Sequence, residues 1–397
     1  MSLAQSYLNG QLSVVDNRPL GTNDWARYQG RWYVSFPPFP AIVILPAVAL
    51  FGPQIWDRLF WAIFAGLGPA FLYLVLRYLR ESARSERKLS DDLLLTFLFA
   101  FGTVYFFSSV QGTTWYAAHI VCCALLPLFV LWSFNARRPL LAGTALAFSF
   151  LTRPNTVLVA LFFLVEAVNG STRERLGQCD GDQPPTTGLR AWISGVDYAR
   201  VLRRVTVFSL PIIAAVAVML WMNNSRFDDP LVFGHEYLEI KWRYRIDKWS
   251  LFNYHYLSKN LAILLAALPW LSNDPPFIKI SQHGLALWFT TPHLLLILWP
   301  KRVTPTMVGL YLSAALVALV DLCYQNSGWI QFGYRFSLDY MVLLFALLAL
   351  GQRRFRLGFY SLVVFALAVN LFGAITFDRV KQFYDTDLTQ TVIFQPD

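Results

Sequence analysis

The sequence TWYAAHIVCCALLPLFVLWSF, residues 114–134, is an apolar run without a single aspartate, glutamate, lysine or arginine. As an α-helix it would be roughly 31 Å long, which matches the ~30 Å hydrocarbon core of a bilayer. Working outward from it, further apolar runs bounded by charged residues follow at 57–79, 91–110, 139–152, 154–169, 205–222, 284–300, 303–323, 336–351 and 357–375. The pattern predicts an all-α polytopic membrane protein with about ten spanning helices.

The amino-acid composition also indicates a membrane protein. Hydrophobic residues make up 56% of the 397 residues and charged residues only 14%, whereas soluble domains carry about 25% charged residues. The formal net charge is +9, but the basic residues stand in short loops between the apolar runs. The positive-inside rule explains this excess, so we expect no nucleic-acid partner.

The arginine and lysine residues orient the chain. The basic loops at 77–88, 137–138, 173–204, 301–302 and 353–356 are expected on the cytoplasmic side. A first outer loop over 1–56, a cytoplasmic loop over 170–204 and a second outer loop region over 223–283 then belong to a single domain, residues 1–397. The apolar pieces 39–52 and 260–272 are too short to span and are expected to form interfacial helices in the outer loops.

The first outer loop concentrates charge and aromatic rings in DWARYQGRWY, residues 24–33, before the proline-rich FPPFP at 36–40. A carboxylate beside the membrane can act as a general base toward a hydroxyl acceptor, and we assign this role to Asp24. Rings such as Trp32 and Tyr33 offer sugars an apolar face, while Arg27 and Arg31 can bind an anionic group. The alternative is that Asp24 is a solvated loop residue.

Two more polar groups are expected at the outer ends of spans. Arg153 stands in a turn between two helices, where it either reaches lipid headgroups or binds a lipid phosphate. Tyr334, Arg335 and Asp339 lie at the outer end of the run 336–351. Arg335 and Asp339 are four residues apart, so on an α-helix they would share a face and form either a structural ion pair or part of a site.

The second outer loop is basic and aromatic although orientation does not require it. One interpretation is that long loops cross the membrane regardless of charge. The other is a surface for an anionic amphiphile such as a lipid phosphate or a sugar, with Arg226, His235 and Lys241 as binding residues.

Other catalytic patterns are missing from the sequence. It contains no G-x-S-x-G, H-E-x-x-H or Walker motif, and its five histidines and four cysteines lack metal-ligand spacing. We therefore predict no metal and no cofactor. An enzyme of this kind would receive its activated donor in lipid form.

The order of several short motifs resembles that of bacterial GT-C membrane glycosyltransferases. They are AQSYLNGQL (4–12), ND (23–24), YQGRWY (28–33), FPPFPA (36–41), LFG (50–52), FLTRP (150–154), NSRFDDPL (224–231), FG (233–234) and FGYRF (332–336). The nearest group is glycosyltransferase family 39, which includes protein O-mannosyltransferases and lipid A aminoarabinose transferases. The resemblance implies a GT-C-like bundle in the plasma (inner) membrane with its active site on the extracytoplasmic side.

The same resemblance implies a polyprenyl-phosphate sugar as donor and a glycan, lipid or protein as acceptor, with membrane lipids around the protein. The base maps to Asp24 and the phosphate-facing cations map to Arg31, Arg153 and Arg335. In that family a spanning helix precedes the first outer loop. The base is therefore expected either at Asp24 or on an acid upstream of Met1.

Two other functions fit a chain with many spans. A transporter or flippase of lipid-linked sugars is one, although transporters tend to carry repeats and ionisable residues near the bilayer midplane. A non-catalytic truncated relative of the glycosyltransferases is the other.

Overall fold

Helices dominate the fold, which is described here from a computed structural model for residues 1–14, 24–175, 195–240 and 242–384. Within these ranges, six helical segments are long and apolar enough to span a membrane, or seven if the bent pair α5 and α6 is one span. Their helices are α3 (Asp57–Phe64), α4 (Leu67–Glu81), α5 (Leu89–Phe101), α6 (Tyr105–Gln111), α7 (Thr114–Ser133), α9 (Ala160–Arg175), α11 (Tyr198–Phe227), α15 (Pro305–Leu322) and α17 (Leu357–Thr376).

Shorter elements complete the bundle and build its ends. The helices are α1 (Ser2–Leu8), α2 (Phe39–Phe51), α8 (Pro139–Phe150), α12 (Arg243–Trp249), α13 (Leu257–Ala266), α14 (Leu287–Thr290) and α16 (Met341–Leu350). Tight 3-10 turns are η1 (Phe134–Ala136), η2 (Pro154–Val159), η3 (Gly234–Tyr237), η4 (Tyr254–Tyr256), η5 (Pro292–Leu298), η6 (Arg335–Asp339) and η7 (Lys381–Phe383). Two antiparallel hairpins pair β1 (Trp25–Tyr28) with β2 (Arg31–Val34) and β3 (Trp270–Leu271) with β4 (Ile278–Lys279).

The prediction of an all-α polytopic membrane protein is confirmed, and every apolar run named above contains helix. The predicted number of about ten spanning helices is too high, because the described residues contain six or seven helical segments that are long and apolar enough to span. Two of the runs are more broken than predicted. The run 284–300 forms only α14 and η5, because Pro292 lacks a backbone N–H and interrupts the helix. The run 336–351 begins as the 3-10 turn η6 and leaves just ten residues for α16.

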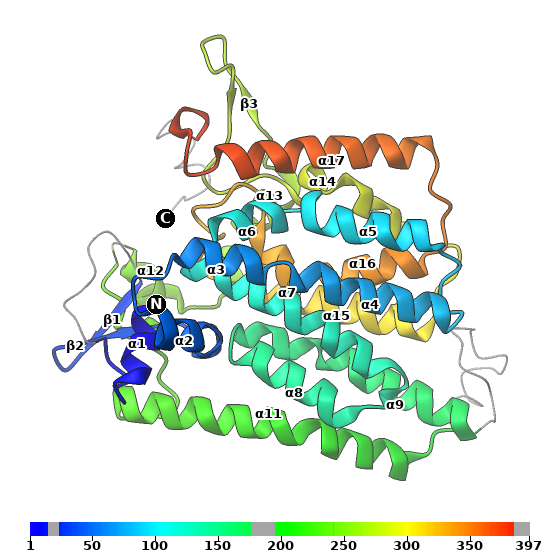
Figure 1. The fold of residues 1–397 in the computed structure, drawn as a ribbon, viewed down its shortest axis with the longest axis horizontal. Coiled ribbons are helices and arrows are strands. Elements are labelled where there is room, and N and C mark those ends of the chain that lie inside the picture. The colour runs from blue at the N-terminus through cyan, green and yellow to red at the C-terminus, as the bar shows by residue number, and fades with distance from the viewer. Residues whose placement is uncertain (15–23, 176–194, 241, 385–397) are drawn as a thin grey trace.

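The long helices run side by side, and β1, β2, α1 and α12 lie together at one end of the bundle (Figure 1). Close packing sets the spacing between them. A Cβ atom at Gly143 of α8 would lie 2.1 Å from the carbonyl oxygen of Phe208 in α11. Small residues let helices in membranes approach closely in this way.

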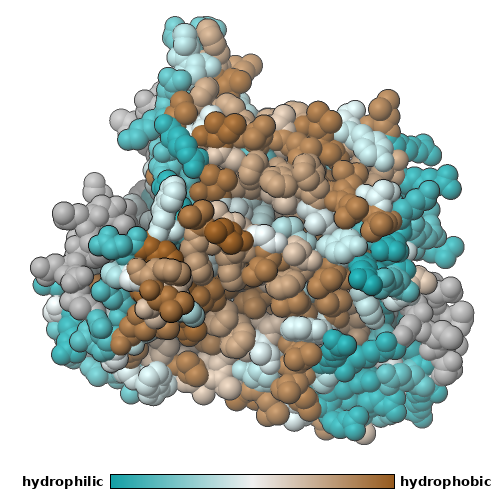
Figure 2. Space-filling model, viewed as in Figure 1, coloured by the Kyte–Doolittle hydropathy of each residue, from teal (hydrophilic) through white to brown (hydrophobic). Residues whose placement is uncertain are grey.

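The opposite end of the bundle collects the arginine-rich loops. There Arg84 is fully buried and donates hydrogen bonds to Asn135 (2.7 Å) and Thr306 (2.9 Å), with Glu166 3.6 Å away. Figure 2 shows hydrophobic residues over the middle of the helices and hydrophilic residues at this end. The loops predicted as cytoplasmic thus lie together, and the two loops predicted as outer meet at the other end.

Candidate functional site

Asp24 lies where the first outer loop enters the β1–β2 hairpin. Its backbone is left-handed, with φ of 70°, a conformation that aspartate tolerates better than most residues. The hydroxyl of Ser35, just past β2, donates a hydrogen bond to the Asp24 carbonyl (3.1 Å) and closes the base of the hairpin. The side chain of Asp24 is thereby directed at the bundle, where the indole Nε1 of Trp115 donates to its Oδ2 at 2.8 Å.

The surroundings of Asp24 favour a proton acceptor. Burial raises the pKa of its carboxyl above the ordinary value of 3.8, while the Trp115 hydrogen bond and the positive charge of Arg335 oppose that rise. A carboxylate with a raised pKa takes a proton more readily than a solvated one. Asp24 is half-buried and its carboxylate accepts a hydrogen bond from Trp115, so the structure gives it a fixed partner in the bundle.

Arg335 is the cation whose charge acts on Asp24. It is 5% exposed, and its guanidinium lies over the rings of Tyr116 (5.0 Å) and Phe336 (5.6 Å). Among the described residues no carboxylate forms a salt bridge with it, and its Nε has no hydrogen-bond partner. Burial lowers the pKa of Arg335, and the nearby Asp24 charge opposes that effect. A buried guanidinium without a counter-ion is suited to binding an anionic ligand.

Arg153 is also at this end, but its charge is neutralised. Its Nε donates to both carboxylate oxygens of Asp339, at 2.6 and 2.7 Å. Asn155 donates to the same carboxylate at 2.7 Å, and His119 Nδ1 lies 3.1 Å from it. The predicted pairing of Arg335 with Asp339 is therefore wrong. In the 3-10 turn η6 residues four apart do not share a face, and Asp339 binds Arg153 instead.

The two hairpin arginines lie away from Asp24. Arg31 stands opposite Tyr28 at the turn of the hairpin, four strand residues and thus roughly 13 Å from Asp24. Its side chain is exposed. Arg27 forms an exposed salt bridge with Glu239 of the second loop at 3.5 Å. The structure does not bring either arginine beside the candidate base.

Tyr33 and Arg226 join the first outer loop to the end of α11. Tyr33 packs edge-on against Phe227, with ring centroids 5.3 Å apart. Arg226 is buried and donates to the carbonyl of Val34 at 3.2 Å. Both residues therefore hold the hairpin in place, and neither contacts Asp24.

The remaining predicted binding residues lie in separate surroundings. The Trp32 ring lies under the Arg27 guanidinium at 5.5 Å. His235 is half-buried, and the partial loss of solvent around its ring lowers its pKa to about 4, so the ring is neutral at pH 7. Tyr334 is buried beside Arg335 in the chain, while Lys241 lies outside the described residues.

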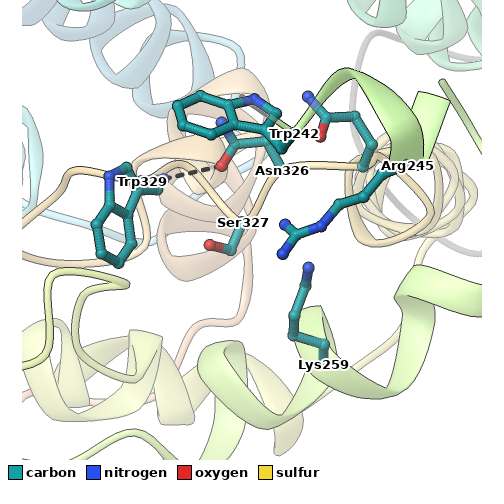
Figure 3. Close-up of a pocket in the computed structure, with 7 residues that line it drawn as sticks. Trp242, Arg245, Lys259, Asn326, Ser327 and Trp329 are labelled. Carbon is teal, nitrogen blue, oxygen red and sulfur yellow. Dashed lines mark hydrogen bonds between the residues drawn. The ribbon is translucent and has the colours of Figure 1, made fainter. Parts of the chain in front are cut away.

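A cavity of about 90 Å³ opens between the second outer loop and the segment after α15 (Figure 3). It is lined by Trp242, Arg245, Lys259, Gln325, Asn326, Ser327 and Trp329. Among the lining residues, Asn326 accepts hydrogen bonds from the backbone N–H groups of Gly328 and Trp329 at 2.9 and 3.0 Å. This turn presents Ser327 and Trp329 to the cavity.

Several of these residues escaped the sequence prediction. Trp115 and Tyr116 stand inside the apolar run 114–134, where nothing in the sequence distinguishes them from ordinary lipid-facing rings. Lys259 directly precedes the apolar piece 260–272, and Ser327 lies in an uncharged turn. The excess of basic residues in the second outer loop was the one sequence signal for this cavity. It indicated the loop, but it did not indicate the segment after α15 that forms the other wall.

Comparison with known proteins does not identify the function of this chain. No protein-family model and no curated protein matches the chain. Among solved structures, it is similar to the archaeal oligosaccharyltransferase AglB from Archaeoglobus fulgidus, in complex with an inhibitory peptide and a dolichol-phosphate. The match has a TM-score of 0.40 and 14% identity, over 96% of this chain and 51% of that one. The chain thus spans about half the length of that protein, and a TM-score this low carries no argument.

Proposed function

We propose that this chain is an integral membrane glycosyltransferase that moves a sugar from a polyprenyl-phosphate-linked donor to a hydroxyl group of an extracytoplasmic acceptor. One observation carries the proposal. The half-buried carboxylate of Asp24 accepts a hydrogen bond from Trp115, and the buried guanidinium of Arg335 lies over the ring of the next residue, Tyr116. Among the described residues no carboxylate forms a salt bridge with Arg335, although the charge of Asp24 acts on it. A proton acceptor and an anion-binding cation thus stand together at one end of an apolar bundle.

The reaction that fits this pair is a direct displacement at the anomeric carbon. The acceptor oxygen forms a bond to that carbon while the bond from the carbon to the phosphate oxygen breaks. Asp24 takes the hydroxyl proton, and the polyprenyl phosphate leaves with the bonding electrons. Arg335 stabilises the negative charge that develops on the leaving phosphate, which is the role of fixed cations in transfer reactions of this type.

The positions of Asp24 and Arg335 support these roles of base and phosphate-binding cation. Trp115 donates a hydrogen bond to Asp24 Oδ2, and we assign Oδ1 to the acceptor hydroxyl. Arg335 begins η6, which leads directly into the apolar helix α16. In this proposal the donor phosphate binds at this end of the apolar bundle, and its polyprenyl chain lies in the surrounding membrane.

The test is donor consumption by purified protein in proteoliposomes that contain a polyprenyl-phosphate sugar. Asp24→Asn is expected to lower turnover by about 10²-fold or more, the usual contribution of a general base. Asp229→Asn is the matched control, because Asp229 is an exposed carboxylate on the same side of the protein. Unchanged turnover in Asp24→Asn would remove Asp24 as the base.

A transport function predicts a different result in the same vesicles. Labelled donor would then cross the sealed membrane without losing its sugar. Free polyprenyl phosphate and a glycosylated acceptor are the products expected from transfer, and intact donor on the opposite side is the outcome that would contradict it.

A further inference from the structure

The hairpin of β3 and β4 projects from the side of the helix bundle. In Figure 1 the long helices run along the long axis of the molecule, and the hairpin leaves the bundle across that axis, next to the C-terminal end of α17. Helices that span a membrane lie within about 40° of the membrane normal. The hairpin therefore extends along the membrane surface and does not point away from it.

Backbone hydrogen bonds fix the depth of the hairpin relative to the bundle. Ile280, which directly follows β4, donates its N–H to the carbonyl of Phe383 in η7 at 2.7 Å. The turn η7 comes shortly after α17 ends at Thr376. The N–H of Ala286 donates to the carbonyl of Ala267 at 2.7 Å, which joins the two segments that flank the hairpin. The hairpin is thus attached where a spanning helix ends, opposite the arginine-rich loops.

The side chains of this hairpin present an exposed apolar face. Leu271 is 87% exposed, Phe277 57% and Ile278 40%. Leu271 stands opposite Ile278 in the register of the two strands, so their side chains lie on the same face of the hairpin. Trp270 and Lys279 are the other register pair and lie on the opposite face. The hairpin is therefore amphipathic.

Exposed apolar residues also occupy the chain on both sides of the hairpin. Leu265 of α13 and Leu268 precede it, and Trp288 of α14 follows it. The indole N–H of Trp288 donates to the carbonyl of Leu265 at 2.7 Å, which ties these two flanks together. Tryptophan is enriched where a protein meets the membrane–water interface. This composition, at the level where α17 ends, favours lipid over water as the neighbour of the hairpin.

The backbone of the hairpin limits how deeply it can enter the membrane. Within the described chain its sheet has two strands, so the outer edge of each strand presents backbone groups that need polar partners. Open sheet edges facing lipid do not occur in the hydrocarbon core. The turn also carries the exposed polar residues Asn273 and Asp274. The backbone therefore fits the headgroup layer, and only the apolar side chains can reach the acyl chains.

We propose that the β3–β4 hairpin is an interfacial anchor that lies on the bilayer surface at the Asp24 end of the bundle, with Leu271, Phe277 and Ile278 inserted among the lipids. Its partner is the phospholipid surface. The inference rests on the membrane-spanning fold and is independent of the proposed function. The anchor holds the second outer loop region against the membrane, beside the end of the bundle where Asp24 and Arg335 lie.

The test measures which relaxing agent reaches a nitroxide label on Leu271→Cys in the full chain in proteoliposomes. Oxygen concentrates among acyl chains, whereas the nickel chelate NiEDDA stays in water. Leu210→Cys, at an exposed position of the spanning helix α11, is the lipid reference. Arg31→Cys, at the exposed turn of the β1–β2 hairpin, is the water reference. Wild type treated in the same way gives the background from the native cysteines.

The ratio of oxygen to NiEDDA accessibility at Leu271→Cys is expected to be several-fold above that at Arg31→Cys and close to that at Leu210→Cys. Lys279→Cys, on the opposite face of the same hairpin, should give a lower ratio than Leu271→Cys. A label at Leu271→Cys that behaves like the water reference would overturn the proposal. Shielding from both agents would overturn it as well, because a second copy or another protein would then cover the hairpin.

Discussion

Replacing Arg335 by glutamine separates a ligand-binding cation from a structural one. The change removes a buried charge, whose burial costs several kcal/mol, and also removes two cation–π contacts of about 0.5–2 kcal/mol each. Removing the buried charge stabilises the fold, whereas losing the two cation–π contacts destabilises it. Among the described residues no carboxylate forms a salt bridge with Arg335, so the change leaves no buried partner charge behind. We expect the free energy of unfolding to change by less than about 2 kcal/mol. Loss of the phosphate contact should lower kcat/KM by about 10²–10³-fold.

Two measurements on the same preparation check this expectation. Thermal or denaturant unfolding in detergent gives the stability, and donor consumption in proteoliposomes gives kcat/KM. Arg335→Lys keeps the charge without the planar fork of donors, so its activity should fall between wild type and Arg335→Gln. Full activity in Arg335→Gln would refute the assignment to the leaving phosphate. A destabilisation of several kcal/mol would show that Arg335 is a structural cation instead.

Arg153→Gln should behave in the opposite way and lower the free energy of unfolding by about 3–5 kcal/mol, because Asp339 is left as a buried charge. Adding Asp339→Asn should recover part of that loss, and a double variant less stable than Arg153→Gln would contradict the account. The raised pKa of Asp24 predicts that kcat/KM falls with decreasing pH at values above the ordinary 3.8. Trp115→Phe removes a hydrogen bond that favours the carboxylate, so the acidic limb of the pH–rate profile should move to higher pH, and a move to lower pH would be evidence against it.

Hydrophobic length and charge bias were sufficient to predict the helices. Runs such as 114–134 must be helical in a membrane, since only a helix satisfies each backbone group within the segment. The points at which two of the helices are interrupted were harder to predict. Pro292 interrupts one run as its chemistry suggests, but the 3-10 turn from Arg335 to Asp339 depends on tertiary contacts that no local pattern contains.

The sequence predicted the charged residues of the candidate site but not their partners. Asp24, Arg153 and Arg335 stood out because charges next to apolar runs are rare. Their partners did not, because the indole of Trp115 and the amide of Asn155 look like ordinary residues in the sequence. Which arginine is neutralised depends on which carboxylate reaches it, and Asp339 lies 186 residues from Arg153 in the chain.

This difference in pairing suggests how one end of the bundle can be both stable and reactive. Arg153, Asn155 and His119 surround the Asp339 carboxylate and fix α7, η2 and η6 relative to one another. Arg335 begins the same turn η6, so the network that satisfies Asp339 also places a guanidinium that no described carboxylate satisfies. The energetic cost of burying that charge is offset by the rings of Tyr116 and Phe336 and by the nearby charge of Asp24. An arriving phosphate recovers the cost as binding energy, which gives the fold a physical reason to maintain it.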